Sequence, residues 1–92
     1  MTFQPEKVDD FLKIFNDSKT KIRGFAGCRH LELWQDHCQT HIFTTYSFWE
    51  DEQALNQYRD SELFKEVWGH TKVLFAEKPR AYSQKKFQEV QL

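Results

Sequence analysis

The residues most able to do chemistry lie between positions 46 and 68, where aromatic rings alternate with charged side chains. A buried tyrosine hydroxyl or indole N–H requires a hydrogen-bond partner, and a cavity supplies one as water or a polar ligand. Rings at helical spacing are more often core than binding site. We therefore expect Trp49 and Phe64 to be mainly core, and we expect four other rings to wall a pocket between sheet and helices: Tyr46, Phe48, Tyr58 and Trp68.

Metal and nucleophile chemistry has weaker support. The run His37-Cys38-x-x-His41, with Cys28 and His30 nearby, contains metal-ligand residue types. A structural zinc site needs about four converging ligands, and this run falls at a predicted turn, so we predict a solvated turn and no metal. No catalytic triad or glycine-rich phosphate loop can be assembled. With no secretory signal, the two cysteines are predicted to be reduced thiols.

The bulk properties predict one domain over residues 1–92 and exclude several classes of protein. The formal net charge is -1, from 13 basic and 14 acidic residues. No basic stripe indicates nucleic-acid binding, and no apolar run reaches the roughly 18 residues of a spanning helix. We expect a cytoplasmic protein. A short chain buries a modest core, so oligomerisation is a natural way to bury more surface.

The periodicity predicts a helix over residues 5–22, stopped by Gly24 and Gly27, and then an antiparallel hairpin of strands 28–34 and 40–49. Leu31 and Leu33 share one face of the first strand. In the second, Ile42, Thr44, Tyr46 and Phe48 share one face. A helix opened by acids at 50–52 follows, then a helix capped by Asp60 or Ser61, and a last strand over 80–90. With residues 1–4 as a short first strand, the order is βαββαβ, an α+β ferredoxin-like fold.

Three runs of the chain resemble the antibiotic biosynthesis monooxygenase domain: "IRGFAGCRHLEL", "FTTYSFWEDEQALNQYRDSELFKEVW" and "KVLFAEKPRAYS". The resemblance rests on Gly27-Cys28 before a strand, Trp49-Glu50 at a strand-to-helix junction, Ala54-Leu55, and Tyr58-x-x-Ser61-x-x-Phe64. It covers Pro5 to about Ser83. It implies a dimeric α/β barrel, and thus a homodimer. The family's first strand is longer, so we expect the native chain to extend by roughly six to eight residues at its amino terminus.

The resemblance also implies chemistry, because some members are cofactor-independent monooxygenases that act on quinols, anthrones and related phenolic polyketides. In these the substrate carbanion itself reacts with oxygen, so neither flavin nor metal is needed. Other members degrade haem. Quinol-type members often have histidines where this chain has Tyr58 and Leu63, and haem-degrading members have a tryptophan and a histidine at the positions of Tyr58 and Trp68. The haem reading is therefore disfavoured.

The function expected from these residues is oxidation of a small phenolic, quinol or polyketide-like aromatic molecule without a cofactor. Such a substrate needs a base or a donor that stabilises a phenolate. The available groups are Tyr58, Trp68, His30 and His70 as catalytic candidates, and Tyr46, Phe48 and Arg59 as substrate-binding candidates. The alternatives are a non-catalytic module that binds a small aromatic ligand and a purely structural dimer.

Overall fold

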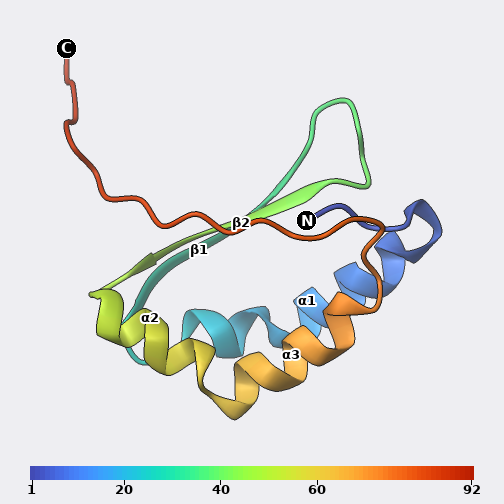
Figure 1. Ribbon diagram of the computed structural model, residues 1–92. Coiled ribbons are helices and arrows are strands. Elements are labelled where there is room, and N and C mark those ends of the chain that lie inside the picture. The colour runs from blue at the N-terminus through green and yellow to red at the C-terminus, as the bar shows by residue number, and fades with distance from the viewer.

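Three helices lie along one face of an antiparallel hairpin, and the opposite face of the hairpin has no helix over it (Figure 1). This arrangement comes from a computed structural model that describes residues 1–92. The two-layer pattern is the predicted α+β class. None of the helices could span a membrane, since the longest, Val8–Arg23, has only 16 residues.

The first helix forms as the periodicity predicts, with a tighter first turn. Pro5–Lys7 (η1) is a 3-10 turn that starts at the proline, and α1 spans Val8–Arg23. The helix ends at Gly24, and Gly27 then adopts φ 86°, a conformation that favours glycine. A Cβ at Gly27 would collide with the side chain of Ala54, so this glycine also lets the chain pass close to α2.

The hairpin has the two predicted faces. β1 (Cys28–Gln35) pairs with β2 (Phe43–Trp49), and the register places His30 opposite Phe48 and Glu32 opposite Tyr46. Side chains alternate between the two sides of a strand. Consequently the odd-numbered residues of β2 face the helices, and the even-numbered residues lie on the uncovered face.

Two side-chain caps define the second and third helices. Asp51 accepts a hydrogen bond from the Ala54 N–H (2.8 Å) at the start of α2 (Glu52–Arg59). The Ser61 hydroxyl accepts from the Phe64 N–H (3.1 Å) at the start of α3 (Glu62–Lys72), which decides between the two predicted caps in favour of serine. Both caps satisfy N–H groups that the helix itself leaves unpaired.

The four amino-terminal residues lie in the middle of the sheet, between β2 and the chain after α3. Thr2 bridges to Ile42, and Phe3 bridges to Phe75, both antiparallel. Phe3 has no exposed surface and stacks on Phe11 with ring centroids 4.2 Å apart. The core cluster around it consists of Phe3, Phe11, Phe43 and Leu74. The predicted short first strand is thus reduced to two bridges at the centre of the core.

The strand predicted over residues 80–90 does not form, and residues 76–92 (the tail) have no helix or strand. A strand requires a neighbour for its N–H and C=O groups. The tail leaves the sheet after Ala76 and Glu77 donate to the Thr2 carbonyl, and its large apolar side chains are exposed. The weak alternation of the sequence is present, but no strand of the chain pairs with it.

Candidate active site

A continuous row of aromatic rings lies on the helix side of the sheet and contains two of the predicted site residues. Neighbouring ring centroids in this row are 4.9 to 5.9 Å apart. One member ends β2, one lies on α2, two lie four residues apart on one face of α3, and the last follows α3. In order, the aromatic row consists of Trp49, Tyr58, Phe64, Trp68 and Phe75.

Tyr58 is half-buried in this row, where it stacks on Trp49 and contacts Phe25 and Phe64 edge-on. Burial, with a smaller contribution from Cys28, raises the pKa of Tyr58 to about 12. The hydroxyl therefore keeps its proton at neutral pH. Tyr58 is equipped to donate a hydrogen bond rather than to accept a proton from a substrate.

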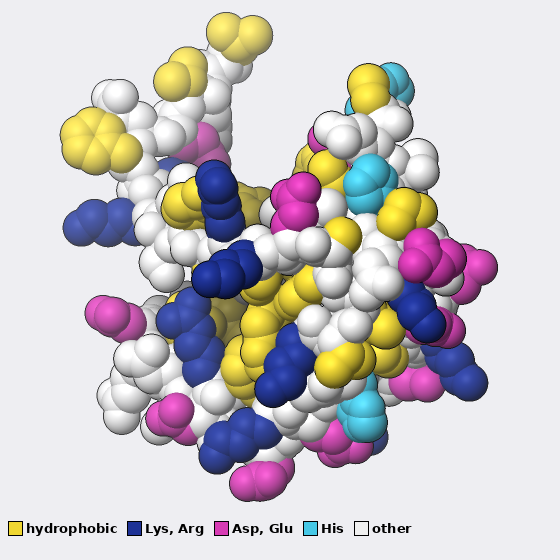
Figure 2. Space-filling model, turned by 45° about the vertical axis from the view of Figure 1, so that its right-hand side comes forward, with side chains coloured by type: hydrophobic (Ala, Val, Ile, Leu, Met, Phe, Trp, Pro, Cys, Tyr) yellow, Lys and Arg dark blue, Asp and Glu magenta, His cyan; other side chains and the backbone are white.

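Trp68 walls an open groove at the point where α3 passes into the tail. The groove has a volume of about 360 Å³ and is lined by Trp68, Lys72, Phe75, Glu77, Lys78 and Pro79, among others. Figure 2 shows an apolar hollow with Lys and Arg side chains around it. This volume falls at the lower end of the range for small-molecule sites.

Two of the three polar groups of the aromatic row have no partner in the protein and are reachable by a ligand. The indole N–H groups of Trp34 and Trp49 donate to Glu32 and Ser47, whereas that of Trp68 has no protein acceptor. The Tyr58 hydroxyl likewise has none, and no polar side-chain atom is buried without a partner. The Tyr58 and Trp68 donors are therefore exposed to solvent and free to bind an oxygen atom of a ligand.

The other predicted rings, Tyr46 and Phe48, lie on the opposite, uncovered face of the hairpin and not with Tyr58 and Trp68. Each is 46% exposed, and their rings contact edge-on at 4.9 Å. The expected common wall of four rings is thus divided by the sheet into two surfaces. The alternation of the sequence predicted that Tyr46 and Phe48 share one face. Which face the helices cover depends on tertiary packing, which the alternation does not determine.

His30 lies on the same uncovered face and is paired with a carboxylate. Its Nε2 is 2.8 Å from the Glu32 carboxylate, and its ring lies 5.2 Å from that of Phe48. The other oxygen of Glu32 accepts from the Trp34 indole N–H at 2.8 Å. The pKa of Glu32 is lowered, because His30 and then Trp34 hydrogen-bond to its charged form. The carboxylate therefore stays ionised and orients the imidazole.

The remaining two predicted site residues are separate from both surfaces. His70 is exposed and lines a small recess of about 70 Å³ between α1 and α3, beside Lys21 and Glu66. Arg59 is the exposed last residue of α2. The sequence placed these residues near the aromatic ones, but the helical rotation turns them outward.

Two parts of the arrangement were missed by sequence reasoning. The alternation of β1 predicts that Glu32 and Trp34 share the face of His30, but the pairing of the Glu32 carboxylate with the imidazole was not predicted. The sequence contains no comparable signal for the groove residues Phe75, Lys72 and Lys78, because the groove forms only where the chain turns back after α3. The turn predicted after the first strand forms, and in it Asp36 accepts from the Cys38 and Gln39 N–H groups. No three His, Cys, Asp or Glu side chains lie close enough together to hold a metal ion.

Residues 1–68 match the sequence model of the family described as Antibiotic biosynthesis monooxygenase. The chain belongs to the antibiotic biosynthesis monooxygenase family. This membership confirms the resemblance read from the strand and helix motifs. A search of curated proteins found no match.

Solved structures confirm the fold of this family member. A conserved protein from Methanosarcina mazei Go1 is 25% identical, with a TM-score of 0.80 over 84% of this chain and 76% of that chain. A protein from Bordetella bronchiseptica is 21% identical, with a TM-score of 0.83 over 96% and 91%. An antibiotic biosynthesis monooxygenase is 21% identical, with a TM-score of 0.78 over 84% and 81%. At such identities the likeness establishes the ferredoxin-like α+β fold and not the reaction.

Proposed function

We propose that the protein is a cofactor-independent monooxygenase, an oxidoreductase that uses dioxygen to oxidise a small phenolic, quinol or polyketide-like aromatic molecule. The proposal depends on one observation in this member of the antibiotic biosynthesis monooxygenase family. The aromatic row leads to the open groove at Trp68, which is large enough for a small molecule. We further propose that it acts as a cytoplasmic homodimer.

The proposed reaction requires few functional groups from the protein. A phenol or an anthrone-type CH2 group that loses a proton becomes electron-rich and reacts directly with oxygen. Conversion of that CH2 group to a carbonyl supplies four electrons, so one oxygen atom enters the product and the other leaves as water. The protein has to bind the ring, favour the deprotonated form and shield it from solvent.

Trp68 and Tyr58 suit the task of favouring the anion. Each has a free donor on the same aromatic row, and the raised pKa of Tyr58 keeps its hydroxyl protonated while a substrate oxygen becomes negative. Donors already in place where charge develops stabilise the transition state without reorganisation. We assign Trp68 to the substrate in the groove and Tyr58 to a ligand that extends along the row.

The uncovered sheet face supports a second location for the same reaction. His30, oriented by Glu32 at 2.8 Å, is the predicted candidate best arranged to accept a proton, and Tyr46 and Phe48 offer rings on which a substrate would stack. As the face lies open, this site would be enclosed only when a second copy packs upon it. His70 and Arg59 lack comparable surroundings and take no part in the proposal.

The test is oxygen uptake over a panel of small quinols and anthrones, with no added cofactor, for the wild type and two variants. Trp68→Phe removes the donor in the groove, and His30→Asn removes the base on the uncovered face. Loss of uptake in only one variant identifies the surface that reacts. Uptake equal to the buffer blank across the panel, despite measurable binding, would reject the enzyme and support the binding-module alternative.

A further inference from the structure

The walls of the groove are held rigid by packing and by backbone pairing. Phe64 stacks behind Trp68 with centroids 5.9 Å apart and planes at 10°, and Phe3 supports Phe75 at 5.2 Å. The Leu74 carbonyl accepts from the Gln4 N–H (3.0 Å), and the Ala76 N–H donates to the Thr2 carbonyl (2.8 Å). The site is therefore preformed, which lowers the entropic cost of binding.

The shape of the floor suits a flat ring. The Trp68 and Phe75 rings are 5.5 Å apart with planes at 59°, so together they form a corner and not a parallel slot. A planar ligand can stack on one ring and meet the other edge-on, which are the two favoured aromatic geometries. Pro79 also lines the groove, and Trp68, whose indole N–H has no acceptor in the protein, is one of its lining residues.

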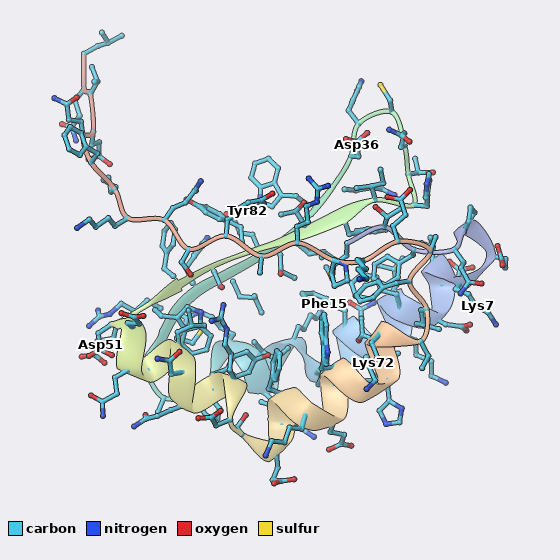
Figure 3. The ribbon with its side chains drawn as sticks, in the orientation of Figure 1. Lys7, Phe15, Asp36, Asp51, Lys72 and Tyr82 are labelled. Carbon is cyan, nitrogen blue, oxygen red and sulfur yellow. The ribbon has the colours of Figure 1, made fainter.

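Two lysines add positive charge to the lining of the groove. Lys72 lies where α3 passes into the tail (Figure 3), and Lys78 lies six residues further on. Neither is within ion-pair distance of a carboxylate; the ion pairs of the protein join other residues. Residues 72–86 contain five basic residues and one acidic residue, in a chain whose net charge is -1.

Two features disfavour the binding of an anion in the groove, and their effect is smaller than that of the two lysines. Glu77 also lines the groove, and the carboxyl end of α3 carries partial negative charge. The helix end by itself accounts for Lys72, because cations are favoured there. It does not account for Lys78, which lies beyond the helix. The lining residues retain a net positive charge.

From this combination we infer that the groove binds a planar aromatic ligand that carries a negative charge, such as an aromatic carboxylate or a phenolate. The ring lies in the corner of Trp68 and Phe75, and the anionic group is placed between Lys72, Lys78 and the Trp68 N–H. The inference rests on the proposed function only in taking this ligand class to be the substrate class. Binding of the ligand does not depend on turnover.

The experiment compares 2-naphthoate with its neutral isostere 2-naphthamide by calorimetry under nitrogen, so that no oxidation interferes. Wild-type protein should bind naphthoate more tightly, and added salt should weaken only naphthoate binding. The double variant Lys72→Gln, Lys78→Gln should bind naphthoate roughly 3- to 20-fold more weakly and naphthamide unchanged, as expected for two exposed charge pairs. The control variant Lys13→Gln, Lys65→Gln loses the same charge from exposed sites elsewhere and should behave as wild type.

The three indole N–H resonances locate the ligand without any substitution, because Trp34 lies on the uncovered face, and Trp49 is separated from Trp68 in the aromatic row by Tyr58 and Phe64. Naphthoate should shift the Trp68 resonance most. A largest shift at Trp34 would place the ligand on the uncovered face and overturn the inference. Equal affinities of the wild type for naphthoate and naphthamide would also overturn it, and so would equal losses of naphthoate affinity in the two double variants. Naphthoate binding at Trp68 together with absent oxygen uptake would sustain the inference and reject the monooxygenase.

Discussion

The ring of Tyr58 stacks on that of Trp49 with centroids 4.9 Å apart and planes at 25°, while its hydroxyl contacts no protein acceptor. The ring of Tyr58 therefore contributes to packing, and its hydroxyl is the group available for chemistry. Tyr58→Phe should therefore change the free energy of unfolding by less than about 1 kcal/mol. If Tyr58 holds the substrate anion, the same substitution should lower turnover on the order of 10²–10³. Urea unfolding and oxygen uptake measure the two effects.

The matched control is Tyr82→Phe, which deletes the same hydroxyl from the exposed tail. It should leave both turnover and stability at the wild-type values. Turnover that is unchanged in Tyr58→Phe would remove Tyr58 from the reaction while leaving the groove at Trp68 to be tested by itself.

Burial of Tyr58 also makes stability depend on alkaline pH. Its pKa rises from 10.0 to about 12 in the folded protein. Between these values the unfolded chain has released the proton and the folded chain retains it, so stability falls as pH rises. The contribution is fully present below pH 10 and is lost as pH passes through about 12. Urea midpoints across this range should fall less steeply for Tyr58→Phe than for the wild type. Parallel declines would contradict the assigned pKa.

Gly27 and Gly69 form a matched pair with opposite expectations. Gly27 has φ 86°, and a Cβ there would meet the side chain of Ala54, so Gly27→Ala should destabilise the protein by about 1–3 kcal/mol. Gly69 is exposed in α3 with open space around it, so Gly69→Ala should stabilise by roughly 0.5–1 kcal/mol through helix propensity. Thermal unfolding of the two variants checks the signs. Destabilisation by both would show that the space at Gly69 is filled in solution.

The uncovered hairpin face should mediate dimer formation. Trp34, Tyr46 and Phe48 expose large rings on it, a pattern typical of a surface that another molecule covers. Light scattering of the wild type should give twice the 11.2 kDa chain mass. Phe48→Lys should shift the equilibrium toward the monomer, because it places a charge in the interface.

The control for that substitution is Val73→Lys, which places the same charge on a residue that is 67% exposed at the end of α3. It should remain a dimer. A wild type that stays at 11.2 kDa across micromolar concentrations would refute the homodimer.

Local features of this protein were determined by the sequence alone. The sequence predicted a cap of α3 at Asp60 or Ser61, of which Ser61 forms it, and the two-residue alternation predicted that Tyr46 and Phe48 share a face. Family membership was also readable from the motifs around Gly27, Trp49 and Tyr58. Caps and alternation depend on residues two to four positions apart, so a short stretch of chain contains all the information.

Tertiary structure decided the rest. The sequence assigned Tyr46, Phe48, Tyr58 and Trp68 to one wall, and the sheet separates them because the helices cover only one of its faces. The groove depends on Phe3 pairing with Phe75, seventy-two residues away, which sets the chain after α3 beside Trp68. The expected strand over 80–90 has no strand of the chain to pair with. Each of these outcomes depends on contacts between distant segments, and neither periodicity nor spacing contains that information.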